Sequence, residues 1–404
     1  MNQKDKSFSA DAGLEYAVKQ LRQWSHEQVP LPNTCPELGL GEMATLDLLA
    51  PHVLGRAARL DRPDTLAHMD PPTPWITWAT ALWNARLNQN LLHPATAPFA
   101  REAEKLVVEW LTPFFGMNGG HMCSGSTLAN LTALWAARDV QGVKKIIASE
   151  AAHLSVKKAA VILGLTYVSI PNDANGQLDL AQLDDLSEAC LVLTAGTTST
   201  GAIDPLELAG QAKWTHIDAA WAGPLRLSET YAHLLEGVDK ADSIAVSAHK
   251  WLFQPKDSAL VMFREPELAN AAISFGGGYL AAPNIGVQGS RGAAAIPLLA
   301  TMIAWGRKGL ADRIEHSMAI ADRLAKELSN EPSITLWAMP KTGVTLFRPL
   351  SCSTEDFCRQ LPEGMLSTCI VDNTSWLRSV AANPVADIDR IISTIKEVIQ
   401  RDNA

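Results

Sequence analysis

The chain has 404 residues and 47% apolar composition, which is enough for one large buried core and a smaller second one. It carries 34 Lys and Arg against 43 Asp and Glu, a net charge of −9, and no basic run of the kind that follows a phosphate backbone, so no nucleic-acid partner is expected. The first thirty residues are polar, and no apolar run approaches the roughly 20 residues that cross a bilayer. We therefore expect a cytoplasmic protein with no membrane contact.

Helical patterns begin the chain. Apolar residues recur at helical spacing over residues 14–24 and 43–60, on either side of a proline-rich loop at 29–35. Residues 1–65 are therefore predicted to form an N-terminal helical arm that packs on another surface.

The next helix is predicted to carry a stripe of large apolar side chains. Over residues 75–87 they recur at near-helical spacing, as Trp75, Trp78, Leu82, Trp83 and Leu87. Such a stripe is more often a core contact than an aromatic box around a cofactor, so we expect it to face a core.

The middle of the chain alternates between two kinds of pattern. Helices are predicted at 99–114, 127–139, 153–163 and 179–187. Short apolar runs typical of strands lie between and after them, at 144–148, 166–170, 190–194, 214–217, 243–247 and 258–263. This alternation predicts an α/β domain over residues 66–300, with a mostly parallel sheet covered by helices on both faces. A ligand site is then expected at the carboxyl ends of the strands.

The C-terminal part differs. A long helical pattern at 293–329 leads into a smaller α/β domain, predicted over residues 301–404, whose last helix carries several isoleucines on one face. The six cysteines form no C-x-x-C pair and no zinc-like spacing, so we expect free thiols and no metal.

Lys250 stands at the end of one predicted strand, after the run "ADSIAVSAH". A lysine amine in a partly desolvated pocket has a lowered pKa and can form a Schiff base with an aldehyde, which is how pyridoxal phosphate is held. The alternative is an ordinary surface lysine with its amine in water.

Three other strand ends carry polar residues. In "HMCSGSTLANL", small polar residues that include Ser126 and Thr127 stand directly before a helix, which makes an anion site or an ordinary helix cap. In "WTHIDAAWAG", Asp218 ends an apolar run, where a buried carboxylate needs a cation such as a protonated pyridine nitrogen, unless it caps a turn. In "SEAAHLSVKKAA", His153 begins a helix and could stack on a cofactor ring or act as a cap.

Together with "GTTSTGAIDPLE", these stretches resemble the pyridoxal-phosphate-dependent group II amino acid decarboxylases. The resemblance runs from about Asn88 to Arg307, with a weaker echo in "LRSVAANP". It implies fold type I, the aspartate aminotransferase-like α/β fold with a mostly parallel seven-stranded sheet and a small C-terminal α/β domain. It also implies pyridoxal 5′-phosphate as cofactor and a homodimer with sites at the interface.

The resemblance assigns roles residue by residue. Lys250 matches the Schiff-base lysine and His249 the histidine before it, Asp218 the partner of the ring nitrogen, and His153 the stacking histidine. Other positions match cofactor contacts: Ser126 and Thr127 for the phosphate, Thr198 near the ring oxygen, Ala220 against the ring, and Gly289, Ser290 and Arg291 reaching the phosphate from the partner subunit.

This sequence departs from the family in two places. Ser247 stands where many members have Asn or Asp, which shortens one polar contact to the cofactor. Only "AAPNIGVQG" separates Tyr279-Leu280 from Ser290-Arg291, so the loop tyrosine that donates a proton in many members has no counterpart in that segment. Tyr279 and His249 are the candidate replacements. The longer stretch "FQPKDSALVMFRE" followed by "GGGYLAAPNIGVQGSRG" more closely resembles the archaeal tyrosine decarboxylases and the sphingosine phosphate lyases, relatives that share the fold.

We therefore expect a homodimeric lyase that decarboxylates an L-amino acid. Within enzymes, the alternatives are a carbon–carbon lyase that releases an aldehyde from a phosphorylated amino alcohol, and a transaminase. A catalytically inactive homologue with a binding or structural role is the alternative outside enzymes. The sequence does not identify the substrate side chain.

Overall fold

The computed structural model describes residues 12–278 and 280–402. It separates into two compact units, one that ends at Arg59 and one that starts at Leu60. The first unit contains two helices, α1 (Ala12–Gln20) and α2 (Glu42–Val53). Asp47 of α2 accepts hydrogen bonds from two side chains of α1, so the two helices hold each other. The predicted arm boundary at residue 65 lies shortly after the start of the second unit.

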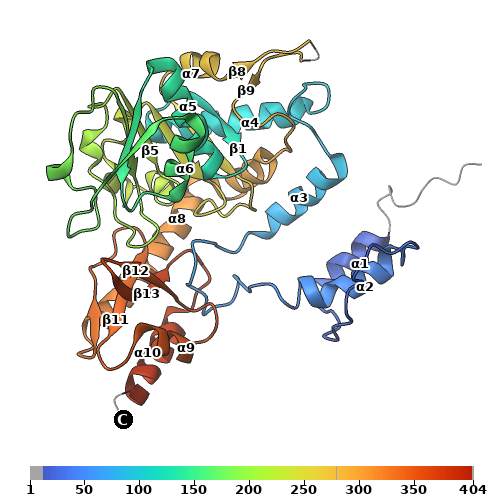
Figure 1. Cartoon of the computed structure of the whole chain (residues 1–404). Coiled ribbons are helices and arrows are strands. Elements are labelled where there is room, and N and C mark those ends of the chain that lie inside the picture. The colour runs from blue at the N-terminus through green and yellow to red at the C-terminus, as the bar shows by residue number, and fades with distance from the viewer. Residues whose placement is uncertain (1–11, 279, 403–404) are drawn as a thin grey trace, which may run out of the picture. The chain divides into compact units, whose positions relative to one another are not determined.

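A seven-stranded sheet forms the centre of the second unit (Figure 1). In chain order its strands are β1 (Gly119–Cys123), β2 (Lys145–Ser149), β3 (Thr166–Ile170), β4 (Ala189–Thr194), β5 (Trp214–Asp218), β6 (Ser243–Ser247) and β7 (Ala259–Phe263). Their order in space is β1-β7-β6-β5-β4-β2-β3, and only β7 runs antiparallel to its two neighbours. The prediction of a mostly parallel central sheet is therefore confirmed.

Both faces of this sheet are buried, because alternate residues of each strand enter different cores. In β4, Leu191 and Leu193 join one core and Cys190 and Val192 the other. The first core includes side chains of α4 (Pro98–Leu111) and α8 (Ala295–Ser329). The second includes side chains of α5 (Ser126–Gln141), α6 (Leu154–Leu163) and α7 (Pro266–Ala272). The result is a helix–sheet–helix arrangement.

The C-terminal part packs around the second half of α8. Its antiparallel sheet has the order β10-β11-β13-β12. Its elements are β10 (Ile334–Leu336), β11 (Val344–Pro349), α9 (Thr354–Gln360), β12 (Ser367–Val371), β13 (Thr374–Val380) and α10 (Ile388–Asp402). Ile391 and Ile395 of α10 are fully buried in this core, as the predicted isoleucine face requires.

Shorter elements complete the second unit. They are the helix α3 (Trp75–Leu87), the strand pair β8 (Ser274–Phe275) and β9 (Asn284–Ile285), and the 3-10 helices η2 (Thr112–Phe115), η3 (Leu180–Gln182), η4 (Leu206–Leu208), η5 (Gly223–Leu227), η6 (Ala232–Leu235) and η7 (Val238–Lys240).

Two predicted elements differ from the structure. Residues 179–187 do not form a helix beyond the single turn of η3, because Asp185 accepts hydrogen bonds from both the backbone and the hydroxyl of Ser187 and so competes with helical bonding. Strand β1 was not predicted, since "GGHMC" lacks the branched side chains typical of strands.

The prediction that the α3 stripe faces a core is wrong for the isolated chain. Trp75, Trp78 and Trp83 are 70%, 56% and 60% exposed. The helix instead buries Thr77 and Thr80, whose hydroxyls bond to carbonyls of the preceding turn. Small side chains allow the closer approach, so the tryptophans are left on the outer face.

Two tryptophans whose rings are in tilted contact join the large sheet to the C-terminal part. The rings of Trp221 and Trp251 lie 4.1 Å apart, and both are buried. Trp221 donates a hydrogen bond to the Thr342 carbonyl (2.7 Å) and Trp251 to the Ala381 carbonyl (3.1 Å). Because Trp251 follows Lys250 in the chain, this contact also anchors the turn that carries the lysine.

We expect Gly343→Ala to destabilise the protein by roughly 2 to 5 kcal/mol, because it combines two costs. Gly343 has a φ of 73°, and a β-carbon there would lie 2.8 Å from the Trp251 ring. Gly142→Ala is the matched control, since Gly142 has a φ of 61° but no atom within 4 Å of the added carbon. Denaturant unfolding of both variants separates ring contact from backbone strain, and equal losses would contradict the role of the ring contact.

Candidate active site

The polar residues predicted for the site follow strands that end at one edge of the sheet. Asp218 ends β5, Ser247 ends β6, and the turn at Ser124 follows β1. His153 lies just after β2, between that strand and α6. Since parallel strands bring their carboxyl ends together, the topology gathers these groups from distant parts of the chain.

Lys250 lies in the turn after β6. It is partly buried, and its amine has no ion-pair partner in the part of the chain that the structure describes. Burial lowers the pKa of Lys250, and the nearby carboxylates of Asp218 and Asp70 oppose that shift. The pKa of the amine is therefore lowered mainly by burial, and no ion pair within the described residues offsets that effect.

Asp218 is 4% exposed and is oriented by two hydrogen bonds. Its Oδ1 accepts from the backbone N–H of Ala220 (3.1 Å), and its Oδ2 accepts from the side-chain amide of Asn130 on α5 (2.8 Å). Among the described residues no cationic side chain forms an ion pair with Asp218. A buried carboxylate of this kind suits a cationic ligand atom.

His153 caps the start of α6. Its Nδ1 accepts from the backbone N–H of Ser155 (3.3 Å) and lies 2.7 Å from the Ser155 hydroxyl. Burial lowers the pKa of His153, and Lys250 and Lys158 lower it further while Asp218 opposes them. Both Asp218 and Lys250 contribute to this shift, so the imidazole lies within electrostatic range of both.

An anion cup lies at the start of α5. Gly125, the N-cap residue, has a φ of 126° and no side chain that could cap the helix. The first N–H groups of α5 therefore form no hydrogen bond with a capping side chain. Ser126 is half-buried and Thr127 is exposed, and both begin this helix. These hydroxyls and N–H groups are the donors that a phosphate requires.

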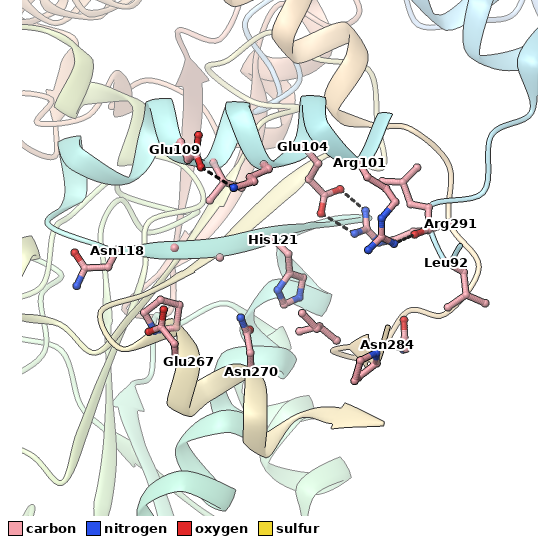
Figure 2. A pocket seen from close by; sticks show the side chains of 18 of the residues that line it. Leu92, Arg101, Glu104, Glu109, Asn118, His121, Glu267, Asn270, Asn284 and Arg291 are labelled. Carbon is pink, nitrogen blue, oxygen red and sulfur yellow. Dashed lines mark hydrogen bonds and ion pairs between the residues drawn. The ribbon is translucent and has the colours of Figure 1, made fainter. Parts of the chain in front are cut away.

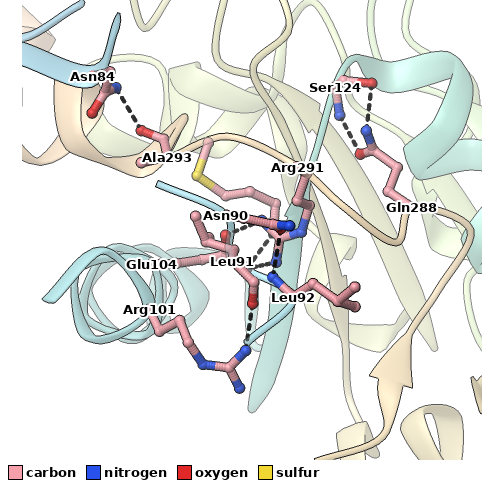
Figure 3. Close-up of polar contacts among 11 residues, drawn as sticks. Asn84, Asn90, Leu91, Leu92, Arg101, Glu104, Ser124, Gln288, Arg291 and Ala293 are labelled. Carbon is pink, nitrogen blue, oxygen red and sulfur yellow. Dashed lines mark hydrogen bonds and ion pairs between the residues drawn. The ribbon is translucent and has the colours of Figure 1, made fainter. Parts of the chain in front are cut away.

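The segment at residues 288–291 borders this cup in the same chain (Figure 3). Gln288 and Ser124 exchange two hydrogen bonds, of 2.9 and 3.0 Å. Ser290 accepts from Asn90 (3.1 Å), and Arg291 forms an ion pair with Glu104. A cleft of about 620 Å³ opens beside these residues and is lined by both Ser124 and Ser258.

The remaining predicted contacts lie around the strand ends. Ala220 is buried, as a residue that lies against a ring requires, while Thr198 is exposed and its neighbour Thr197 is buried. Ser247 is fully buried, and its hydroxyl has no partner among the described residues. The hydroxyl of Thr194, which lies opposite Asp218 in the β4–β5 register, is also unsatisfied within those residues.

His249 bonds to the backbone rather than to a side chain. Its Nδ1 donates to the Ser258 carbonyl (3.0 Å), because a carbonyl can only accept. Burial, assisted by Lys256 and Lys250, lowers the pKa of His249 to about 4. At neutral pH its Nε2 therefore has a free lone pair and carries no proton. Tyr279, the other candidate proton donor, lies outside the described residues.

Sequence reasoning missed two groups at this site. Asn130 lies inside α5, where the pattern indicated only a helix. Arg378 of β13 is close enough to Lys250 to lower its pKa, its Nε has no partner in the described chain, and burial lowers its own pKa. The motif "LRSVAANP" was the available signal for Arg378.

A second cleft, of about 360 Å³, lies at the β1 edge of the sheet, between α4 and α7 (Figure 2). Glu104 and Arg291 pair on one side of it, and His121 faces it from β1. Of the predicted cofactor contacts this cleft is lined only by Gly289 and Arg291, and the other predicted contacts lie elsewhere.

Over the described residues, no helix is long and apolar enough to cross a membrane, and no group of three possible metal ligands occurs. The six cysteines are free, and burial raises the pKa of Cys123 to about 12.

Comparison with known proteins identifies the family. The profile of the pyridoxal-dependent decarboxylase conserved domain matches residues 54–349. The chain is similar to an L-2,4-diaminobutyrate decarboxylase of Rhizobium meliloti, at 29% identity over 90% of this chain and 83% of that protein. It is also 29% identical to an aspartate 1-decarboxylase of Aliivibrio fischeri, over 73% of this chain but only 65% of the relative's length.

Solved structures show the same fold. A rice TDC structure with PLP and tryptamine aligns with a TM-score of 0.86 at 20% identity, over 99% of both chains. The glutamate decarboxylase domain of a Vibrio parahaemolyticus diaminobutyrate enzyme aligns with a TM-score of 0.81 at 24% identity, over 96% of this chain and 94% of that one. The fold is that of the fold type I pyridoxal phosphate enzymes.

The residues at the strand ends fit this cofactor. The unsatisfied hydroxyls of Thr194 and Ser247 are available for polar contacts, the uncapped start of α5 suits a phosphate, and the buried Asp218 suits a cationic ring nitrogen.

We expect acid to destabilise the apoprotein between about pH 6.5 and pH 4. Burial lowers the pKa values of His121, His216 and His249 to about 4, so the unfolded chain binds their protons first as the pH falls. Asp204 has the opposite effect and offsets the contribution of one histidine. Burial raises its pKa to about 6, so below that pH the folded state holds a proton that the unfolded state lacks. The net effect is a loss of roughly 1 to 3 kcal/mol per pH unit.

Denaturant unfolding at pH 6.5, 5.5 and 4.5, at one protein concentration, measures this slope. A free energy of unfolding that stays level or rises toward pH 4.5 would contradict the neutral state of these histidines.

Proposed function

The chain belongs to the pyridoxal-dependent decarboxylase family of carboxy-lyases, and we propose that it removes the α-carboxylate of an L-amino acid at the strand-end site, releasing the amine and carbon dioxide. The observation that carries the proposal is the convergence of Lys250, Asp218 and His153. Both Lys250 and His153 are electrostatically coupled to Asp218, although the three residues come from different strand ends. The curated relatives in the comparison include decarboxylases of aspartate and of 2,4-diaminobutyrate.

We propose that the predicted contacts hold pyridoxal phosphate at this site. When bound, this group supplies a ring that accepts the electron pair left when a bond to the substrate Cα breaks. Lys250 is proposed to attach it covalently, Asp218 to pair with its ring nitrogen, and His153 to lie against the ring. Ser126, Thr127 and the first N–H groups of α5 are proposed to bind its phosphate.

Proton transfer is assigned to Lys250. Burial lowers the pKa of its amine, so the amine gains and loses a proton more readily than a lysine in water. His249 suits the opposite role at neutral pH, since its Nε2 can accept a proton but has none to donate. Tyr279 remains a candidate donor from the sequence.

We propose that Arg378 binds a carboxylate of the substrate. Its guanidinium lies near Lys250, and in the described chain it forms no ion pair, whereas Lys256 is paired with Asp70. A buried cation without a carboxylate partner is costly unless a ligand supplies one. The α-carboxylate and an acidic side chain are both compatible with this role.

We further propose a homodimer and a cytoplasmic location. The exposed face of α3 carries three large aromatic rings, and contiguous apolar faces of this kind mark protein interfaces. A second copy of the chain is the occupant that the family resemblance implies. The six free cysteines support a reducing compartment.

The function is tested by carbon dioxide release from a panel of L-amino acids that includes aspartate, 2,4-diaminobutyrate, cysteine sulfinate and tryptophan. We expect release from at least one substrate and a loss of at least 1,000-fold in Lys250→Ala, because both attachment and proton transfer depend on that amine. Arg378→Gln should raise KM more than it lowers kcat, since it removes a binding charge.

Lys240→Ala is the matched control, because this lysine ends η7 and has been assigned no role at the site. Release of an aldehyde without carbon dioxide would instead indicate the carbon–carbon lyase. No carbon dioxide from any substrate, with cofactor bound, would contradict the decarboxylase proposal for this panel.

The dimer is tested by light scattering after size-exclusion chromatography. We expect twice the chain mass for the wild type and a shift toward the single-chain mass in Trp83→Lys, because a buried charge would disrupt an apolar interface. Leu350→Lys is the control, since Leu350 is 61% exposed in the C-terminal part. A wild-type protein with the mass of one chain at micromolar concentration would contradict the proposal.

A further inference from the structure

A buried chain of hydrogen bonds lies behind Asp218 and His153, and the proposed reaction assigns it no role. It joins five residues of α5, α6, β5 and β6, named here the relay: Trp214, Ser243, His216, Asn130 and Ser155. All five are at most 5% exposed. When every buried polar group has a hydrogen-bond partner, the donor and acceptor chemistry of the side chains fixes which atom donates. The direction of each hydrogen bond in the relay can therefore be derived.

Asn130 is oriented by Asp218. A carboxylate only accepts, so the atom of Asn130 that lies 2.8 Å from Asp218 Oδ2 must be the amide nitrogen. The same nitrogen donates its second N–H to the Ser155 hydroxyl (2.9 Å). The amide oxygen therefore faces His216, whose Nε2 lies 3.1 Å away and must carry a proton.

His216 transmits this direction to two further residues. It is fully buried and forms no hydrogen bond or ion pair with a charged side chain of the described residues, and burial lowers its pKa to about 4, so the ring is neutral. With the proton on Nε2, its Nδ1 must accept from the Ser243 hydroxyl (2.9 Å). Ser243 in turn accepts from the Trp214 indole N–H (2.9 Å), which can only donate.

The other branch ends at His153. The Ser155 oxygen accepts from Asn130, so its own proton is free to bond to His153 Nδ1, 2.7 Å away. The Ser155 backbone N–H also donates to that nitrogen (3.3 Å). Two donors toward one nitrogen leave Nδ1 without a proton, and the neutral ring therefore carries its proton on Nε2.

We propose that Asn130 is a positioning residue that sets both the orientation of the Asp218 carboxylate and the tautomer of His153, and that His216, Ser243 and Trp214 keep its amide from turning over. This inference rests on the roles proposed above for Asp218 and His153. If the amide turned over, its oxygen would face the Asp218 carboxylate and its N–H groups would face the His216 N–H. The first contact would be repulsive, and the second would be relieved only if His216 moved its proton from Nε2 to Nδ1, so the relay favours one direction.

The consequence for the site is that one side chain orients two groups, Asp218 at the end of β5 and His153 at the start of α6. Asp218 is held in one orientation by Asn130 and the Ala220 N–H. His153 presents Nε2 as a hydrogen-bond donor and cannot accept a proton there. A preorganised donor and a preorganised carboxylate reduce the cost of arranging the site when ligands bind.

The first measurement is ¹⁵N NMR of histidine-labelled apoprotein, with His153 assigned from the His153→Gln spectrum. We expect an unprotonated Nδ1 and a protonated Nε2 in the wild type. Ser155→Ala removes the hydroxyl donor and should convert His153 to a mixture of tautomers. Ser317→Ala is the matched control, because Ser317 is equally buried and its hydroxyl has no partner in the described chain.

The second measurement is the Kd for pyridoxal phosphate. Asn130→Leu removes a hydrogen bond to a charged group and should raise this Kd roughly 10- to 100-fold. His216→Leu frees the amide to turn over and should raise it roughly 10-fold, whereas His216→Gln keeps an N–H donor and should restore at least half of the wild-type affinity.

Two results would overturn the inference. One is a protonated Nδ1 on His153 in the wild type, or no change in Ser155→Ala. The other is a Kd in both His216→Leu and Asn130→Leu within twofold of the wild type. Should the leucine variants not fold, the Ser155→Ala spectrum decides alone. None of these readouts requires turnover, so an inactive Lys250 site would contradict the proposed function and leave the tautomer result standing.

Discussion

Burial of the Asp218 carboxylate at the end of β5 is the constraint on which this site depends. An isolated carboxylate at 4% exposure would be unstable. Two donated hydrogen bonds, and not a cationic side chain, stabilise it within the described residues. The polar chain from Asn130 to Trp214 occupies positions in two strands and one helix that would otherwise carry apolar side chains. The site therefore takes up space in the core on the α5 side of the sheet.

A second constraint acts on Lys250. Its turn is followed by Trp251, whose ring packs on Trp221 and whose N–H bonds to the C-terminal part. A rotation of the C-terminal part relative to the sheet would strain this contact. The turn that carries the lysine is thus coupled to the packing of the two parts, and so is Arg378, which comes from the small sheet.

Several features of the fold were predictable from local pattern. Six of the seven strands of the central sheet and the long helix α8 follow from apolar periodicity, because buried strands and amphipathic helices differ in period. Strand β1 could not be predicted, because its two glycines and its histidine are not typical of strands. The surrounding structure, and not the local pattern, places these residues in an edge strand. The helix expected at 179–187 failed because a local Asp185–Ser187 turn replaced helical bonding.

The sequence by itself determined which residues are candidates for the site, since Lys250, Asp218 and His153 stand in motifs whose chemistry can be argued from position at strand ends. Only the tertiary structure decided how they are oriented. Asn130 is an unremarkable helix residue in the sequence, and His216 is one more residue of an apolar strand. Hydrogen-bond direction depends on which donors face which acceptors across α5, α6, β5 and β6, and that depends on packing between segments far apart in the chain. The same reason places the α3 tryptophans outside: periodicity defines a face of a helix, and only packing decides which face is covered.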